Sequence, residues 1–413
     1  MTALKDIRVL DFTWYVVGPQ TTRFLAAFGA DIVLVERADD YSGIRRSNAN
    51  KWNKFGPNLS GLFANLNPNK KGVTLNCRHP KGFEIACELA KTCDILIENF
   101  SSRVMESWGL GYETVRRLRP DIIYISMSGF GHTGPKRDYI SFGPTAQAIS
   151  GLTHLSGLPG EPPAGWGFSY MDHTGGYIAA IAALEALHYR DRTGQGQYLD
   201  LSVIEGAITL TGTSVLDKTV NGRGTRRPGY PPGNRSEHPR VAPHNSYRCM
   251  GKDDVGQDLW VAIVCFTDEH WRALRQVLGD PAWARDPRFD TNLGRVKHQD
   301  EIDAHIGRWT EDKDRFDAMY RCQEAGVPAG AAQNSKDRVE DDPQLKARNF
   351  YLELEHGELG RNKIEGMPFK LSRTNWGFSH AAPLWGQHSS QVYPELLGMT
   401  AEEIKRYKEE GVI

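Results

Sequence analysis

The 413-residue chain carries almost no net charge, with 50 Lys and Arg residues against 51 Asp and Glu residues. This balance gives no general attraction to nucleic acid or to an anionic membrane, so neither is expected as a partner. An anionic ligand would therefore have to meet a local group of basic residues.

Long apolar runs are also absent. The most apolar stretch, residues 178–187, is interrupted by Glu185 and is too short to span a bilayer. The start of the chain lacks the hydrophobic segment of a secretory signal. The six cysteines include no CxxC pair, which favours reduced thiols over a disulfide framework. Together these absences predict a cytoplasmic protein that does not enter a membrane.

Several catalytic signatures are missing. The chain contains neither a G-x-S-x-G nucleophile elbow nor a G-x-x-x-x-G-K-[ST] phosphate loop. His238, His244 and Cys249 lack the spacing of a common zinc site, so no metal is expected. The stretch Gly129–Gly134 matches G-x-G-x-x-G. The proline and charged residues that follow it are poor helix starters, and we interpret the motif as a glycine-shaped loop.

Strand-like and helix-like segments alternate along the first half of the chain. This alternation is typical of a doubly wound, Rossmann-like α/β domain, whose parallel strands all end at one edge of the sheet. Strands are predicted at residues 7–12, 31–36, 73–75, 94–98, 121–126 and 198–202. Helices are predicted at residues 20–28 and 81–91, in parts of 104–118, and at 177–189 and 203–216.

The composition changes after this region. Residues 221–245 are rich in Gly, Pro, Arg and Asn and show no apolar periodicity. We therefore place a large Rossmann-like domain at residues 1–220 and a linker with a smaller α+β domain at residues 221–330. Residues 331–413 form a last segment.

Asp172 stands where a helical pattern begins. Apolar residues recur every three positions from Ile178 to Leu187. Asp172 is thus expected near a helix N-terminus, where backbone N–H groups favour a negative charge. Gly175 and Gly176 would let a ligand approach the backbone closely. A simple N-cap role for Asp172 is the alternative.

Basic residues recur beside the predicted strands. If they share one edge of the sheet, they can converge on a phosphate-bearing ligand, and scattered surface charge is the alternative. These residues are Arg37, Lys70, Lys71, Arg103, Lys136 and Arg137.

A series of motifs, taken in order, resembles the class III coenzyme A (CoA) transferases. This family includes formyl-CoA:oxalate and carnitine CoA-transferases as well as α-methylacyl-CoA racemases. The resemblance covers nearly the whole chain. Its motifs lie at residues 7–13, 18–19, 25–31, 35–37, 67–71, 94–100, 128–135, 172–176, 192–197, 326–330, 368–372 and 382–388.

The resemblance implies both a fold and a chemistry. Residues 331–413 would return to the large domain, and two chains, identical or homologous, would interlock as a dimer. Acyl-CoA and a carboxylic acid would be the substrates, with no prosthetic group. Asp172 would be a nucleophile that forms a mixed anhydride and then an aspartyl-CoA thioester. A low pKa at the helix start would keep its carboxylate ionised.

The resemblance also implies CoA contacts by position. Arg37 would meet the phosphates. Arg103 would supply the charge of a family arginine whose position is Ser107 here. The implied contacts are Val16, Arg37, Asn99 and Phe100, with Lys70, Lys71, Arg103 and Lys136 as neighbours of the phosphates or the adenine.

Two other functions are alternatives to CoA transfer. A racemase needs a histidine where this chain has Phe142, so proton exchange would lack one partner. A non-catalytic, CoA-binding subunit of a heteromeric transferase is the other alternative, and the presence of Asp172 argues against it.

The acceptor acid is suggested only by finer similarity. Residues 233–249 look most like subunits of succinyl-CoA:benzylsuccinate CoA-transferases, which act on an aryl dicarboxylate. Arg235 could hold the second carboxylate of such an acid. Aromatic residues could wall an aryl pocket, although core packing is the alternative for each. They are Trp14, Tyr15, Phe142, Trp166, Phe168 and Tyr170.

Overall fold

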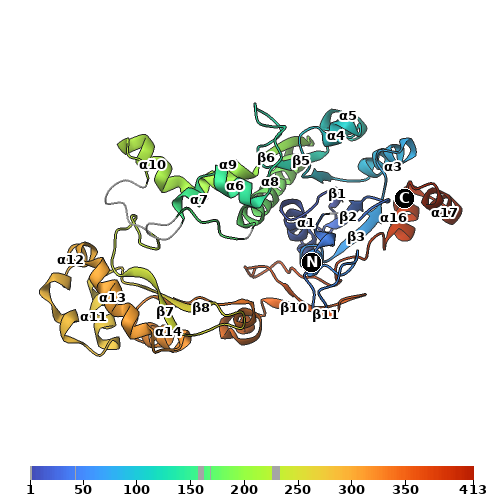
Figure 1. Ribbon diagram of the computed structural model, residues 1–413. Helices are drawn as coiled ribbons and strands as arrows, with labels where there is room; N and C mark the ends of the chain where they lie inside the picture. Colours follow the sequence, from blue (N-terminus) through green and yellow to red (C-terminus); the bar gives the residue numbers. More distant parts are fainter. Residues whose placement is uncertain (1, 42, 157–161, 168, 226–232) are drawn as a thin grey trace. The chain divides into compact units, whose positions relative to one another are not determined.

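The computed structural model describes residues 2–413 except 42, 157–161, 168 and 226–232 (Figure 1). The chain divides into two compact units. The first contains residues 1–152, 165–211 and 343–413, and the second contains residues 153–164 and 212–342. The second unit thus extends beyond the predicted range of residues 221–330 at both ends. It also includes residues 153–164, which the sequence placed in the large domain.

The first unit is built on a six-stranded sheet with the order β3-β2-β1-β4-β5-β6. Each neighbouring pair is parallel. This is the doubly wound order, which reverses between β1 and β4, and it confirms the α/β prediction. The strands are β1 (Arg8–Asp11), β2 (Asp31–Glu36), β3 (Lys70–Thr74), β4 (Ile95–Glu98), β5 (Ile123–Ser128) and β6 (Gln197–Ser202).

Helices cover both faces of this sheet. Successive strand residues point to opposite faces, so Val9 enters one apolar core and Leu10 the other. On the Val9 face lie α1 (Val17–Ala27) and α8 (Tyr170–Thr193). On the Leu10 face lie α3 (Pro80–Lys91), α5 (Tyr112–Leu118), α16 (Ser389–Leu397) and α17 (Ala401–Glu409).

Several helices begin or divide where the sequence did not predict it. The helix predicted from residue 20 begins at Val17, so Gly18 and Pro19 lie in the first turn of α1, where the missing N–H of proline costs nothing. The region 203–216 divides into three short helices. Residues 39–66, for which no helix or strand is predicted above, also contain helical turns. The short helices of these two regions are η1 (Gly43–Arg46), α2 (Gly61–Leu66), α9 (Val203–Ile208), η2 (Thr209–Thr211) and α10 (Gly212–Asn221), of which α10 belongs to the second unit. Other short helices are α4 (Val104–Ser107), α6 (Gly143–Ile149) and α7 (Leu152–Leu155).

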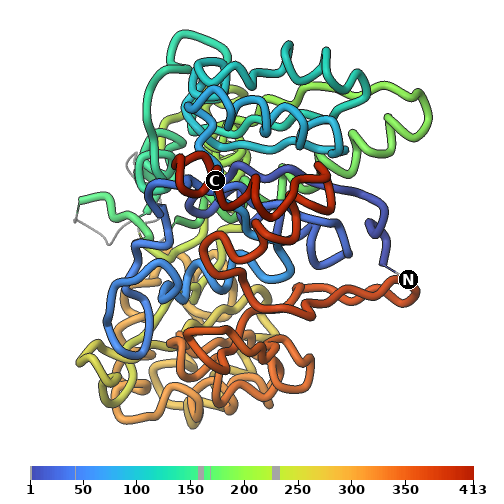
Figure 2. The backbone as a smooth tube through the Cα atoms, turned by 90° about the vertical axis from the view of Figure 1, so that its right-hand side faces the viewer, coloured from blue at the N-terminus to red at the C-terminus, as the bar shows by residue number. Residues whose placement is uncertain are grey.

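The last part of the chain returns to the first unit. After α15 (Pro343–Ala347), strands β10 (Tyr351–His356) and β11 (Gly360–Glu365) form an antiparallel hairpin. Helix α16 then packs against β3 and α3. The N–H of Asn76 donates to the carbonyl of Val412 at 2.8 Å. Figure 2 shows this C-terminal segment lying against the N-terminal part of the unit.

The second unit has a three-stranded antiparallel sheet in the order β7-β8-β9. Its core surrounds Trp271 and Phe289, both fully buried. Its elements are β7 (His244–Lys252), β8 (Asp258–Val264), α11 (Asp268–Val277), η3 (Ala282–Arg285), η4 (Pro287–Phe289), α12 (Asn292–Lys297), α13 (Gln299–Thr310), α14 (Arg315–Glu324), β9 (Ala329–Ala331) and the π-helical turn η5 (Asp337–Asp341). Among the described residues of both units, no helix has the length and apolar character needed to cross a bilayer.

A buried ion pair joins β1, β3 and α1. Lys70 Nζ lies 3.2 Å from Asp11 Oδ2 and 2.6 Å from Thr22 Oγ1, and neither charged side chain is exposed. Burial lowers the pKa of Lys70, and Asp11 opposes this effect. The next residue, Lys71, pairs with Asp31 at 2.9 Å but is partly exposed.

These adjacent lysines provide a matched test of burial. We expect Lys70→Met to lower the free energy of unfolding by about 3–5 kcal/mol, because it leaves the Asp11 charge buried and unpaired. Lys71→Met should cost less than about 1 kcal/mol, since water screens its ion pair. Urea unfolding of both variants measures the difference. Equal losses would contradict the role assigned to the buried pair.

Candidate active site

A cavity of about 240 Å³ opens at the carboxyl edge of the sheet, near the reversal of strand order between β1 and β4. Ligands bind at this place in doubly wound folds. The walls come from the segments after β1, β4 and β5 and from the first turn of α8. They include Trp14, Val16, Asn99, Phe100, Phe142 and Asp172.

Asp172 lies in the first turn of α8, and Ser169 occupies the N-cap position. Asp172 is therefore not the cap. Burial raises the pKa of its carboxyl to about 6, and a hydrogen bond with Ser169 opposes the rise. The expectation of a low pKa is thus wrong, because desolvation outweighs the helix start. At pH 7 roughly nine in ten carboxyls are still ionised, and each is poorly solvated.

Gly175 and Gly176 serve helix packing, which corrects the expectation that they make room for a ligand. Both are buried in α8 against α1. A Cβ atom on Gly176 would come within 2.8 Å of the Gln20 side chain and 2.9 Å of the Val17 carbonyl. The glycines therefore allow α1 and α8 to approach closely.

Asn99 holds the loop that follows β1. Its Oδ1 accepts the Trp14 N–H at 2.7 Å, and its Nδ2 donates to the Trp14 carbonyl at 2.8 Å. Tyr15, which follows Trp14 in the chain, has a φ of 58°, which is unusual for a non-glycine residue. Asn99 therefore fixes a strained loop at the cavity. The structure brings Val16, Asn99 and Phe100 to the cavity of Asp172, and their contact with CoA stays a prediction.

Arg37 lies in a neighbouring recess of about 160 Å³. Trp14 and Phe100 line both this recess and the Asp172 cavity. The guanidinium forms two hydrogen bonds with Asp39, at 3.0 and 2.8 Å. Arg37 is thus near the predicted site, and a phosphate would compete with Asp39 for it.

Lys70 and Lys71 do not line the Asp172 cavity, which does not favour the CoA contact predicted for them. They begin β3, and parallel strands start at the edge opposite the one where they end. The Lys70 ammonium is buried on Asp11, while Lys71 lines a separate cavity with His380 and His388. The prediction treated residues that precede a strand as if they followed it.

Arg103 and Lys136 follow β4 and β5, at the expected edge, but they do not line the Asp172 cavity. Arg103 donates to both oxygens of Asp138 at 2.9 Å. It lines a different cavity of about 440 Å³, together with Arg137. Lys136 is exposed on the loop after β5.

The predicted aromatic residues divide into groups. Trp14, Tyr15 and Phe142 line the Asp172 cavity, and the rings of Tyr15 and Phe142 meet edge to face at 5.5 Å. Trp166 and Tyr170 pair with each other at 5.0 Å outside that lining. Phe168 lies outside the described residues.

Arg235 is already engaged within the second unit. Its Nη2 lies 2.6 Å from Asp303 and 2.7 Å from Asp300. Two carboxylates therefore compete with any substrate carboxylate for this guanidinium, which weakens the suggested role of Arg235 in substrate binding.

The raised pKa of Asp172 makes stability depend on pH. Its native pKa of about 6 exceeds the ordinary 3.8, so ionisation destabilises the fold as the pH rises from about 4 through 6. Asp172→Asn stays neutral. We expect this variant to be more stable than the wild type by up to about 3 kcal/mol at about pH 8 and by about half that at pH 5.

Urea unfolding at the two pH values measures this effect. Glu185→Gln is the matched control, because Glu185 is exposed on the same helix. It should change stability by less than about 0.5 kcal/mol. A difference for Asp172→Asn that does not vary with pH would contradict the raised pKa.

Comparison with known proteins places this geometry in a family. The CoA-transferase family III model matches residues 4–389. Succinyl-CoA–D-citramalate CoA-transferase of Chloroflexus aurantiacus is 33% identical and covers 99% of this chain and 98% of its own length. Formyl-CoA:oxalate CoA-transferase of Rhodopseudomonas palustris is 30% identical, over 100% of this chain and 97% of its own.

A solved structure agrees. The crystal structure of a CAIB/BAIF family protein from Brucella suis matches 96% of this chain and 99% of its own with a TM-score of 0.82 and 26% identity. Since the family model and the relatives cover nearly the whole sequence, the protein belongs to CoA-transferase family III, and these named relatives are CoA-transferases.

Proposed function

We propose that Asp172 is the nucleophile of the transfer. Its carboxylate attacks the thioester carbonyl of the donor, which forms a mixed anhydride and releases CoA thiolate. The thiolate attacks the aspartyl carbonyl, which gives an aspartyl-CoA thioester and releases the donor acid. The acceptor carboxylate attacks this thioester, which forms a second mixed anhydride and releases CoA thiolate. The thiolate then attacks the acceptor carbonyl and expels the Asp172 carboxylate. The product is the new acyl-CoA, and Asp172 is regenerated.

The observation that carries this proposal is a poorly solvated carboxyl facing a mostly apolar cavity at the reversal point of the sheet. Burial leaves the carboxylate with few hydrogen bonds to lose when it attacks. The apolar walls also limit the water that would hydrolyse an anhydride.

We further propose that the CoA arm passes Val16 and Phe100 and that Arg37 meets the phosphates. Arg103 and Lys136 remain proposed neighbours of CoA at the same sheet edge.

Trapping tests the nucleophile. Incubation with acyl-CoA followed by hydroxylamine or borohydride should modify Asp172, and peptide mass spectrometry identifies the residue. We expect Asp172→Asn to form no adduct and to lose transfer activity by about a thousandfold or more. Glu185→Gln should behave as the wild type. Full activity of Asp172→Asn without any adduct would reject the mechanism. It would then favour the alternative in which this chain is a non-catalytic subunit.

The donor and the acceptor are a second part of the proposal. We propose succinyl-CoA as the donor, as in the Chloroflexus relative, and a dicarboxylic acid as the acceptor. The relatives' acceptors, citramalate and oxalate, are both dicarboxylates. Trp14, Tyr15, Phe100 and Phe142 bring aromatic surface to the cavity, which favours an aryl acid such as benzylsuccinate. Phe142 offers no proton to exchange, which disfavours racemisation.

A panel of acids separates these acceptors. With succinyl-CoA as the donor, we expect aryl dicarboxylates to give at least about a tenfold higher kcat/KM than small aliphatic dicarboxylates. Phe142→Ala should reduce this preference, because it removes aromatic surface from the cavity. Reaction with small aliphatic acids alone would reject the aryl acceptor. It would not affect the proposal that Asp172 is the nucleophile.

We also propose that the chain works as an interlocked dimer, either with itself or with a homologous subunit. Helix α8 has apolar residues on both its buried and its outward sides. Ile181 is 58% exposed, and Tyr177 and Leu184 are 37% exposed. A helix that is apolar all round usually packs on more than one neighbour. Light scattering of the purified chain alone distinguishes a homodimer from a subunit that needs a different partner.

A further inference from the structure

Glu98 is a buried carboxyl next to the cavity wall that has no place in the steps above. It is the last residue of β4 and is 1% exposed. Its Oε2 accepts the backbone N–H of Phe100 at 2.8 Å. Its Oε1 is buried and has no hydrogen-bond partner among the described residues. One oxygen thus holds the Phe100 peptide while the other faces elsewhere.

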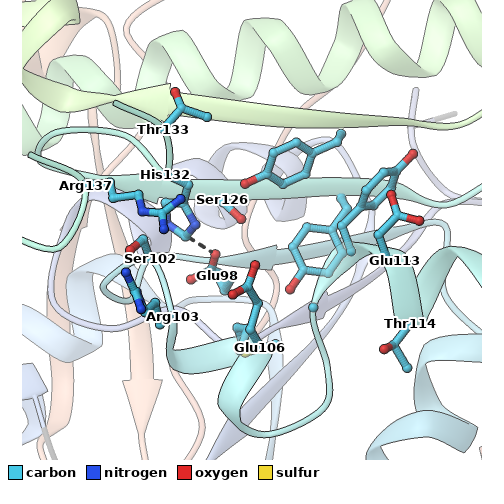
Figure 3. Close-up of a pocket in the computed structure, with 15 residues that line it drawn as sticks. Glu98, Ser102, Arg103, Glu106, Glu113, Thr114, Ser126, His132, Thr133 and Arg137 are labelled. Atoms are coloured by element: carbon cyan, nitrogen blue, oxygen red, sulfur yellow. Dashed lines mark ion pairs between the residues drawn. The ribbon is translucent and has the colours of Figure 1, made fainter. Parts of the chain in front are cut away.

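The other oxygen faces His132, on the loop after β5 (Figure 3). His132 Nε2 lies 3.6 Å from Glu98 Oε1 and, among the described residues, has no hydrogen-bond partner either. The backbone N–H of His132 donates to Asp200 Oδ1 at 2.7 Å, which fixes this loop to β6. The Glu98–His132 pair therefore joins the loops that follow two neighbouring strands.

Phe100 carries the consequence of this pairing to the site. Its ring meets Trp14 edge to face at 5.1 Å and Trp108 at 5.2 Å. Phe100 and Trp14 line both the Asp172 cavity and the Arg37 recess. A rotation of the Phe100 peptide would therefore displace the wall that the two hollows share.

The protonation of the pair agrees with this geometry. Burial raises the pKa of Glu98 to about 8, and hydrogen bonds with Ser126 and Phe100 oppose the rise. Burial lowers the pKa of His132, and Asp200 opposes that effect. Near neutral pH the carboxyl is thus mostly protonated. It accepts the Phe100 N–H through Oε2 and leaves Oε1 free to carry a proton toward His132.

We propose that Glu98 and His132 are positioning residues that fix the Phe100 peptide, and with it the wall between the Asp172 cavity and the Arg37 recess, for acyl-CoA binding. This inference rests on the proposed function of Asp172. Glu98 acts through its hydrogen bond to Phe100 and not as a charge. Glutamine, which also offers an accepting oxygen and a donor, should therefore replace it.

Glu98 variants test the hydrogen bond. Glu98→Leu has a similar volume and no acceptor. We expect it to raise the KM for acyl-CoA by about tenfold with a smaller change in kcat. Glu98→Gln should stay within about threefold of the wild type. Glu113→Gln is the matched control, because Glu113 and Glu98 both line the cavity of about 440 Å³ that contains Arg103, and Glu113 does so from α5. Equal KM values for Glu98→Leu and the wild type, or equal impairment of the Gln and Leu variants, would overturn the proposal.

Hydrogen exchange at the Phe100 amide gives a readout independent of activity. Exchange in a peptide that contains Phe100 should be faster in Glu98→Leu and unchanged in Glu98→Gln. If Glu98→Leu does not fold, His132→Phe is the second variant. It keeps the bond from Glu98 to Phe100, so a smaller rise in KM is expected, and an unchanged KM contradicts the role of the pair.

The trapping experiment separates this proposal from the one beneath it. A wild-type protein that forms no Asp172 adduct contradicts the proposed function. A wild-type protein that forms the adduct while Glu98→Leu binds acyl-CoA normally contradicts only the positioning role.

Discussion

The buried carboxylate of Asp11 holds together the elements that surround the cavity. It accepts the N–H of Thr13 at 2.9 Å and the hydroxyl of Thr22 at 2.6 Å, and it pairs with Lys70. An ionised carboxyl inside a core costs several kcal/mol unless such partners replace its water. The bond to Thr13 sets the direction in which the chain leaves β1, and Trp14 follows immediately. The position of the cavity therefore depends on this cluster.

Three buried carboxyls in the first unit differ in the partners that replace the water lost on burial. Asp11 has a lysine and two threonines around it. Asp172 has only Ser169 to oppose its burial, so the pKa of its carboxyl rises to about 6. Glu98, with two hydrogen bonds and no cation, reaches a pKa of about 8. Asp11, which has a cation and hydroxyl partners, serves the structure, whereas a buried carboxyl without a cation that faces a cavity is a candidate for function, as proposed above for Asp172. The fold thus separates support from chemistry by where it places its cations.

Much of the first unit could be predicted from the sequence, because strand periodicity and strand–helix alternation are local. The two short helices within 104–118 agree with the prediction of helix in parts of that region, whereas the division of 203–216 depends on packing that periodicity does not report. Asp172 was found from its place before a helical pattern, but its raised pKa comes from walls supplied by distant segments. The sequence does not show that α1 lies against Gly175 and Gly176, so their packing role cannot be predicted from it.

The site residues that the sequence missed act over long separations. Glu98 and His132 are 34 positions apart, and only the register of β4 with β5 brings them together. The bond between Asn99 and Trp14 likewise requires β1 and β4 to be neighbours. A strand order known in advance would have placed these pairs side by side, and it would have put Lys71 at the opposite edge.

The discontinuity of the first unit affects how the protein is made. Its sheet is complete in sequence by β6, yet the face that holds Leu10 and Val33 is covered in part by residues near Val392 and Tyr407. Between them lie residues 212–342, which form a unit with its own core. During synthesis this unit can fold while apolar sheet surface of the first is still uncovered. During translation, apolar surface of the sheet therefore stays exposed and prone to aggregation until the last helices emerge. Chaperones would matter most in this period.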